Sequence, residues 1–167
     1  MNDRLTKSDI EKMKEENEYR KLVVRKEALE AVKEARAHGD LSENFEYHAA
    51  KKDKNKNESR IRYLERMIKT AQVIDEESKT DEVGLNNTVS VYFEDDDEVE
   101  TYKIVTTIRE DSLHGKISIE SPLGKALVGH KTGDRVFVSI NDKAGYYVQI
   151  REIENTKEEN EDRIRSF

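Results

Sequence analysis

Residues 35–51 read ARAHGDLSENFEYHAAK, a short polar segment that separates two long helical patterns. The first pattern covers about residues 8–38, contains neither Pro nor Gly, and repeats apolar residues at helical spacing, at Leu22, Leu29, Val32 and Ala35. The second covers about residues 42–73 and repeats them at Ala49, Ala50, Ile61, Leu64, Ile68 and Ala71. Gly39 supplies the left-handed residue that commonly ends a helix. The two patterns predict an antiparallel helical hairpin with a short turn, its first helix capped by Ser8.

After a polar stretch at residues 75–82, the hydrophobic period changes from that of a helix to that of a strand. Alternating apolar residues predict five strands, at 88–93, 102–108, 116–119, 135–140 and 146–150. One short helix is expected between the third and fourth strands, with Ser121 as its N-cap, Pro122 as its first residue and Gly129 just past its end. The second half therefore predicts a small sheet covered by one helix.

The fold class is α+β, an N-terminal antiparallel coiled-coil hairpin followed by a small β-sheet domain with one short helix. The expected domain boundaries are 1–75 for the hairpin, 76–84 for a linker, 85–154 for the sheet domain and 155–167 for a charged tail. The tail is almost wholly charged or polar, which favours disorder or a frayed helix.

Composition places the chain among soluble proteins. The 167 residues include no Cys, and 40% are charged against 34% hydrophobic. The lack of Cys is typical of a reducing, cytosolic setting. No apolar run is long enough to cross a membrane and no signal-peptide pattern is present, so we expect a cytoplasmic protein without a membrane partner. Residues 1–77 hold equal numbers of acidic and basic side chains, so the acidic excess lies in the second half.

The acidic residues Asp40 and Glu43 lie at the predicted turn, and two interpretations compete. As helix caps, Asp40 accepts a backbone N–H at the start of the second helix, and Glu43 reaches back from three residues later. As a functional pair, two carboxylates three residues apart share a helical face and offer the oxygen ligands that Mg²⁺ prefers. Two carboxylates are too few for a strong site, so such a pair would complete a metal site that belongs to another molecule.

The stretch from Tyr47 to Lys69 is distinctly basic, with five more basic than acidic residues. Residues 50–59 include no large apolar side chain, so packing contributes little there. Repulsion among the lysines suggests a polyanion partner, although lysines on a helix are often merely solvated. His38 and His48 flank the turn without zinc-ligand spacing and are interpreted as surface residues. No nucleophile motif, phosphate-binding glycine loop or dinucleotide-binding fingerprint is present, so a self-contained enzyme is not expected.

Two stretches resemble the bacterial GreA/GreB transcript-cleavage factors. The first is residues 34–51, continuing to Arg60-Ile61 and Leu64-Glu65, and the second is residues 115–129, which read GKISIESPLGKALVG, followed by Lys131 and Gly133-Asp134. The resemblance extends from about Leu5 to Ile153. Both stretches in this order are highly specific.

The resemblance implies a transcription elongation factor whose coiled-coil tip enters the secondary channel of RNA polymerase. Asp40 and Glu43 would then act in catalysis by helping to hold Mg²⁺ and its attacking water in the polymerase's own active centre, so that backtracked RNA is hydrolysed near its 3′ end. The chain would need no cofactor of its own and would not itself be an enzyme. We expect a monomer whose partners are RNA polymerase and the nascent RNA 3′ end.

The resemblance also implies roles for residues outside the tip. Basic side chains of the helical hairpin would contact the extruded RNA. These side chains are Arg36, Lys51, Lys52 and Lys54. The second domain would have the FKBP-like sheet fold and dock at the channel rim, with Ser121 and Pro122 as the expected polymerase contact. Prolyl isomerase activity does not follow from that fold.

Three other functions remain open at this point. The first is a Gre-like channel-binding regulator that inhibits polymerase without stimulating cleavage, which would share the fold and the docking. The second is a structural adaptor with a partner-binding coiled coil, disfavoured by the polar interruption at residues 51–59. The third is a nuclease that acts alone, disfavoured because Asp40 and Glu43 have no further ligands nearby in the sequence.

Overall fold

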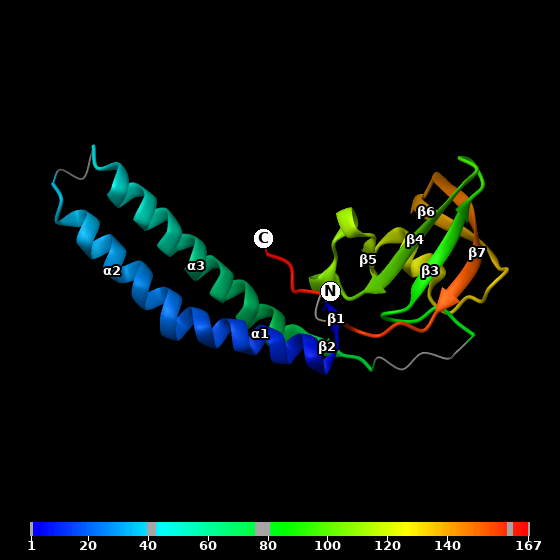
Figure 1. Ribbon diagram of the computed structural model, residues 1–167, viewed down its shortest axis with the longest axis horizontal. Coiled ribbons are helices and arrows are strands. Elements are labelled where there is room, and N and C mark those ends of the chain that lie inside the picture. The colour runs from blue at the N-terminus through cyan, green and yellow to red at the C-terminus, as the bar shows by residue number, and fades with distance from the viewer. Residues whose placement is uncertain (1, 40–42, 76–80, 160–161, 167) are drawn as a thin grey trace. The chain divides into compact units, whose positions relative to one another are not determined.

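The computed structural model describes residues 2–39, 43–75, 81–159 and 162–166. The chain divides into two compact units (Figure 1): a helical hairpin that contains residues 8–72, and a β-sheet domain that contains residues 4–7 and 73–166. In the part of the chain that the structure describes, no helix has both the length and the apolar composition needed to cross a bilayer.

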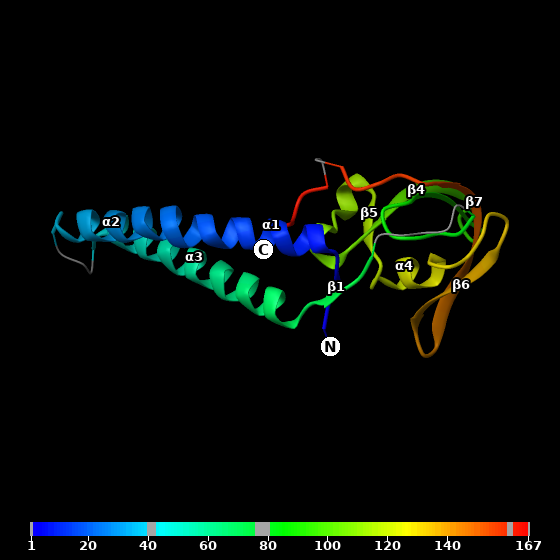
Figure 2. The same cartoon turned by 90° about the horizontal axis from the view of Figure 1, so that it is seen from below.

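The hairpin has one interrupted arm and one continuous arm. The first arm consists of α1 (Lys7–Tyr19), a π-helical turn η1 (Arg20–Val24) and α2 (Arg25–Arg36), and the returning arm is α3 (Phe45–Thr70). Figures 1 and 2 show α2 and α3 running side by side to the tip. The predicted hairpin is confirmed, but the π-helical turn was not predicted, since it leaves no mark in the hydrophobic period.

Two details of the first arm differ from prediction. The helix begins at Lys7, so the residue before it is Thr6, and the expected cap at Ser8 is wrong. Leu22 and Leu29 were expected on the packing face, yet they are 66% and 48% exposed. An extra residue in a π turn shifts the helix face that follows it, which explains why a regular period misassigned Leu29, whereas Leu22 lies within the turn itself.

Apolar packing in the hairpin is concentrated at its open end. Met13 and Leu64 are fully buried, and Ile61 and Met67 are nearly so. Among the described residues near the tip, Ala35 is the buried apolar one. Between these two regions the arms are joined mainly by polar side chains.

The second domain is a five-stranded sheet. Its strands are β3 (Thr88–Phe93), β4 (Glu98–Val105), β5 (Lys116–Ser118), β6 (Arg135–Asn141) and β7 (Ala144–Glu154). Their order is β5-β4-β3-β7-β6, antiparallel except for the parallel pair β4 and β5. Two short strands, β1 (Arg4–Leu5) and β2 (Gln72–Val73), form a separate two-stranded sheet. All five predicted strands are present.

One face of the sheet is covered by the short helix α4 (Pro122–Leu127), as predicted. The Ser121 hydroxyl accepts the Gly124 N–H at 3.0 Å and donates to the Ser118 carbonyl at 2.6 Å. A Cβ on Gly124 would lie 2.0 Å from the Ser118 carbonyl oxygen, so only glycine fits there. Val83, which lies in the expected linker, is 2% exposed in the same core as Leu127.

The prediction of a disordered or frayed tail is wrong for the residues that the structure describes. Residues 155–159 and 162–166 pack on the sheet domain, and Asp162 is 2% exposed. The Arg165 N–H donates to the Ile108 carbonyl at 2.7 Å, and Thr156 Oγ1 donates to the Asn86 carbonyl at 2.6 Å. The prediction from composition failed because the acidic side chains of the tail pair with basic side chains that lie far away in the sequence.

Candidate functional site

Asn44 organises the tip of the hairpin. Its backbone is extended and its side-chain Oδ1 accepts the Tyr47 N–H at 3.0 Å, which makes it the N-cap of α3. Its Nδ2 donates to the Ala35 carbonyl in the last turn of α2 at 2.6 Å. One side chain therefore caps the first turn of α3 and adds a second hydrogen bond to the Ala35 carbonyl, which also accepts the His38 N–H at 3.1 Å.

Two further contacts join the arms beside Asn44. The Arg36 guanidinium lies 5.6 Å from the centroid of the Tyr47 ring, within the range of a cation–π interaction. His38 Nδ1 lies 2.9 Å from Glu46 Oε2, which links the chain just after α2 to the first turn of α3. His38 thus has a structural partner, consistent with its interpretation as a surface residue.

The structure changes the interpretation of the acidic pair. Asp40 lies outside the described residues. Glu43 is exposed in a bend one residue before the Asn44 cap, so it is not in the helix, and the expected shared helical face does not apply to it. For Glu43 the predicted capping role is also wrong, because Asn44 caps α3. Among the described residues, none forms a hydrogen bond or ion pair with the Glu43 carboxylate, and no three His, Asp or Glu side chains gather as a metal site.

The four predicted RNA-contacting residues differ in exposure. Arg36, Lys51 and Lys52 are exposed, whereas Lys54 is half-buried. Lys54 lies close enough to Glu58 to help lower the pKa of that carboxyl. The ion pairs between described residues include none formed by Lys51 or Lys52. Of these four residues, Lys51 and Lys52 are therefore the most available to a partner.

The middle of the hairpin holds a polar cluster that sequence reasoning missed. We call it the shaft network, and it consists of Glu16, Arg20, Asn57 and Arg60. Arg60 donates to both Glu16 carboxylate oxygens, at 2.8 and 3.1 Å, and is 4% exposed. Arg20 donates to Glu16 at 2.7 Å and to Asn57 Oδ1 at 3.0 Å. The network spans both arms where apolar packing is absent.

Electrostatics in this network favour the charged carboxylate. Burial alone would raise the pKa of Glu16, but hydrogen bonds and attraction from Arg60 and Arg20 outweigh it and hold that pKa below its usual value. Arg25 donates to both oxygens of Glu58 at 2.8 and 2.9 Å, and this bond lowers the pKa of Glu58. Lys21 of one arm pairs with Glu65 of the other, and this contact lowers the pKa of the Glu65 carboxyl.

The π-helical turn faces this network. In a π turn the N–H of Arg25 donates to the carbonyl of Arg20, five residues earlier. Asn57 Nδ2 donates to the same carbonyl at 3.4 Å while its Oδ1 accepts from the Arg20 side chain. The sequence shows only a polar Asn57 within the second helical pattern, and its partner Arg20 lies 37 residues away.

The structure places the predicted polymerase contact at the start of α4. Pro122 is exposed, whereas the hydroxyl of Ser121 is committed to the helix cap. Glu120, just before them, pairs with Arg4 at 2.7 Å. Ser121 therefore holds the loop in place, and the exposed ring of Pro122 is available to a partner.

Comparisons with known proteins match both units. Residues 4–73 match the family described as Transcription elongation factor, N-terminal, and residues 77–155 match Transcription elongation factor, GreA/GreB, C-term. The Transcription elongation factor GreA of Thermoanaerobacter pseudethanolicus is 50% identical over 137 residues, which cover 81% of this chain and 87% of the relative. That of Caldanaerobacter subterraneus subsp. tengcongensis is 48% identical over the same shares, and that of Geobacillus kaustophilus is 47% identical over 80% and 85%. The chain therefore belongs to the GreA/GreB family of transcription elongation factors.

Proposed function

We propose that this chain binds RNA polymerase, inserts its hairpin tip into the secondary channel and stimulates the polymerase's own cleavage of backtracked RNA. The observation that carries the proposal is the use of Asn44, rather than Asp40 or Glu43, as the cap of α3. Because the helix does not consume the Glu43 carboxylate, this group is available to a ligand outside the chain.

The donors at the tip suit Mg²⁺, which prefers carboxylate oxygens. Asp40 and Glu43 would hold the cation together with groups of the polymerase active centre, and the bound cation would polarise the phosphate and lower the pKa of a water. Within the chain, Asn44 ties the segment that carries Glu43 to both arms. The positive end of the α3 dipole favours an anion just before the helix.

The remaining parts of the molecule have supporting roles in this proposal. Arg36, Lys51, Lys52 and Lys54 steer the extruded RNA end, with the two exposed lysines most accessible to its phosphates. Pro122 and its neighbours contact the polymerase. The polymerase holds the active centre, so the chain acts as its cofactor and not as a separate nuclease. The shaft network joins the two arms between the tip and the open end of the hairpin.

The test is transcript shortening in a stalled, backtracked elongation complex. We expect the unmodified chain to shorten the RNA and both Asp40→Asn and Glu43→Gln to lose this stimulation. The matched control is Glu46→Gln, which removes an exposed carboxylate in the first turn of α3 and should retain stimulation. Slower elongation without shortening by the unmodified chain would instead support an inhibitory regulator. Shortening without polymerase would support a nuclease.

A further inference from the structure

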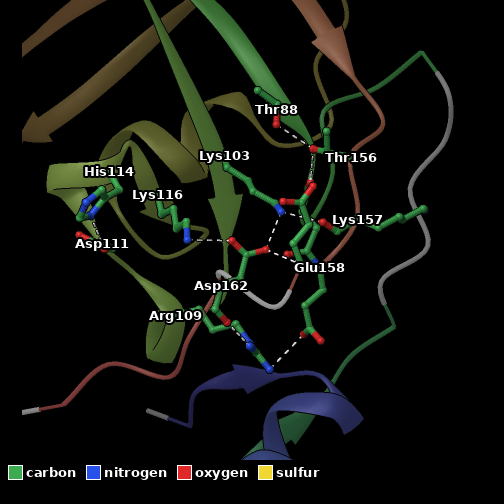
Figure 3. A network of polar contacts seen from close by, with 12 residues as sticks. Thr88, Lys103, Arg109, Asp111, His114, Lys116, Thr156, Lys157, Glu158 and Asp162 are labelled. Carbon is green, nitrogen blue, oxygen red and sulfur yellow. Dashed lines mark hydrogen bonds and ion pairs between the residues drawn. The ribbon is translucent and has the colours of Figure 1, made fainter.

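The tail is held on the sheet domain by a set of cations (Figure 3). Lys103 and Lys116 point toward the Asp162 carboxylate, with Nζ–O distances of 2.5 and 3.0 Å. Arg109 contacts the Asp162 carbonyl and pairs with Glu158 at 3.0 Å. All three cationic side chains are at most 15% exposed, and Asp162 is 2% exposed.

This cationic cluster, formed by Lys103, Arg109 and Lys116, favours an anion. Lys103, Arg109 and Lys116 come from β4, a short 3-10 helix and β5, and they converge on one turn of the tail. Without an opposing charge, three cations that converge on one segment would repel one another. Burial of Asp162 alone would raise its pKa, but hydrogen bonds from Lys103, the Glu159 N–H and Lys116 outweigh it and lower that pKa. The carboxylate is therefore ionised in place.

The cationic side chains contact backbone carbonyl groups of the tail as well as its carboxylates. Lys103 Nζ also donates to the Lys157 carbonyl at 2.6 Å, and Arg109 binds a backbone carbonyl together with a carboxylate. The two carboxylates belong to Glu158 and Asp162, four residues apart. An acidic peptide fits this combination of acceptors, whereas a small inorganic anion would leave the carbonyl contacts unmade.

The tail has the composition of a releasable segment. Residues 155–163 contain no apolar side chain larger than the methyl group of Thr156, and Ile164 is only half-buried. The last strand of the sheet ends at Glu154, and the family match ends at residue 155, so the sheet is complete without the tail. Attachment through ion pairs and hydrogen bonds rather than apolar packing allows another acidic chain to take its place.

We propose that Lys103, Arg109 and Lys116 form a binding site for an acidic peptide segment of a partner protein, and that the chain's own tail occupies this site and competes with that segment. Tethering gives the tail an effective concentration of about millimolar, so an untethered peptide binds appreciably only when the tail is weakened. A partner that is already docked elsewhere on the chain would overcome this barrier. The site lies outside the hairpin tip and does not depend on the function proposed for it.

The test uses the full chain with the tail weakened by Glu158→Gln and Asp162→Asn together. The probe is a fluorescein-labelled peptide with the sequence of residues 155–166, followed by anisotropy at low ionic strength. We expect the double variant to bind it at least about tenfold more tightly than the unmodified chain. A peptide that carries the same two substitutions should lose this affinity. The matched control is Glu159→Gln, an exposed tail carboxylate, which should behave like the unmodified chain.

Three results would overturn the proposal. The first is equal peptide binding by the double variant and the unmodified chain, and the second is equal binding of the substituted peptide. The third is unfolding of the double variant, which would make the tail an integral part of the domain. Amide exchange of the unmodified chain gives an independent measurement: the Arg165 amide should exchange at least about a hundredfold faster than the amides of β3, because the tail opens locally. Equal exchange rates would contradict release.

Discussion

Arg60 of α3 and Glu16 of α1 form a two-point ion pair inside the hairpin, with Nε–Oε2 at 2.8 Å and Nη2–Oε1 at 3.1 Å. Arg60 is almost completely buried, while Glu16 keeps a quarter of its side chain exposed. Such a pair adds little stability over apolar packing, but the loss of one partner leaves the other charge buried without compensation. The two hydrogen bonds form only when Arg60 and Glu16 lie opposite each other, so the pair also favours one register of the two arms.

Arg60→Ala should therefore destabilise the hairpin by about 2–3 kcal/mol. The value lies toward the low end for a buried pair because Arg20 still contacts Glu16 and water reaches part of it. Urea unfolding followed by far-ultraviolet circular dichroism measures the loss. Arg62→Ala is the matched control: it removes an exposed Arg from the same helix and should change stability by less than about 0.5 kcal/mol. Equal losses in the two variants would contradict a structural role for the network.

The lowered pKa of Glu16 predicts a pH dependence of hairpin stability. As the pH falls, the unfolded chain takes up a proton near the ordinary value of 4.5, before the folded protein does. The stabilisation is therefore complete above that pH and is lost as the pH falls through the lower folded-state pKa. Thermal unfolding between pH 7 and pH 3 should show a steeper loss in the unmodified chain than in Glu16→Gln. Parallel curves would show that Glu16 is not responsible.

The main elements were predictable because their causes are local. The two arms follow from helical spacing around Gly39, and the strands follow from alternation such as that of Val89 and Val91. The α4 cap was predictable because Ser121 and Pro122 are adjacent to the helix that they start. Each of these features depends on residues within a few positions of one another.

The features that were missed depend on partners far apart in the sequence. Glu16 and Arg60 are 44 residues apart, and Lys103 and Asp162 are 59 apart, so no window of the sequence contains both members of either pair. The tip was misassigned for a different reason. Asp40, Ser42 and Asn44 are all good N-cap residues, and Asn44 also makes a second bond, to Ala35, that the local sequence does not reveal.

Asn44→Ala should cost about 1–2 kcal/mol because it removes both the cap of α3 and the bond to α2. Asn44→Ser should recover part of this loss, since a hydroxyl can cap the helix but cannot reach the Ala35 carbonyl as well. Exchange of the Tyr47 amide measures the cap directly, and it should be fastest in the Ala variant. Under the proposed function, the Ala variant should also stimulate less RNA cleavage, because the segment that carries Glu43 is no longer fixed. Unchanged Tyr47 exchange would contradict the assignment of the cap.

Under the proposed function, the exposed lysines near the tip predict that RNA crosslinking depends on their charge. Neutralising Lys51 and Lys52 to Gln should weaken crosslinking to the extruded RNA and reduce its dependence on salt, because fewer counterions are released. Adding Arg36→Gln and Lys54→Gln should weaken crosslinking further. The additional loss should be smaller for Lys54→Gln, because Lys54 is half-buried. The matched control neutralises Lys14 and Lys69, two exposed lysines elsewhere on the hairpin. If crosslinking and its salt dependence respond equally to both pairs, the effect is one of net charge and not of position.

Substitutions of Ser121 and Pro122 should distinguish an effect on the stability of the sheet domain from an effect on polymerase binding. Ser121→Ala removes the hydroxyl that accepts the Gly124 N–H and donates to Ser118, so it should lower the stability of the sheet domain by about 1–2 kcal/mol. Pro122→Ala keeps the cap and should change stability by less than about 1 kcal/mol, because Ala is also tolerated at the first helical position. If the exposed Pro122 ring contacts polymerase, this variant should nevertheless weaken polymerase binding in a competition assay against the labelled unmodified chain. Full binding by Pro122→Ala together with weak binding by Ser121→Ala would instead show that only the conformation of the loop matters.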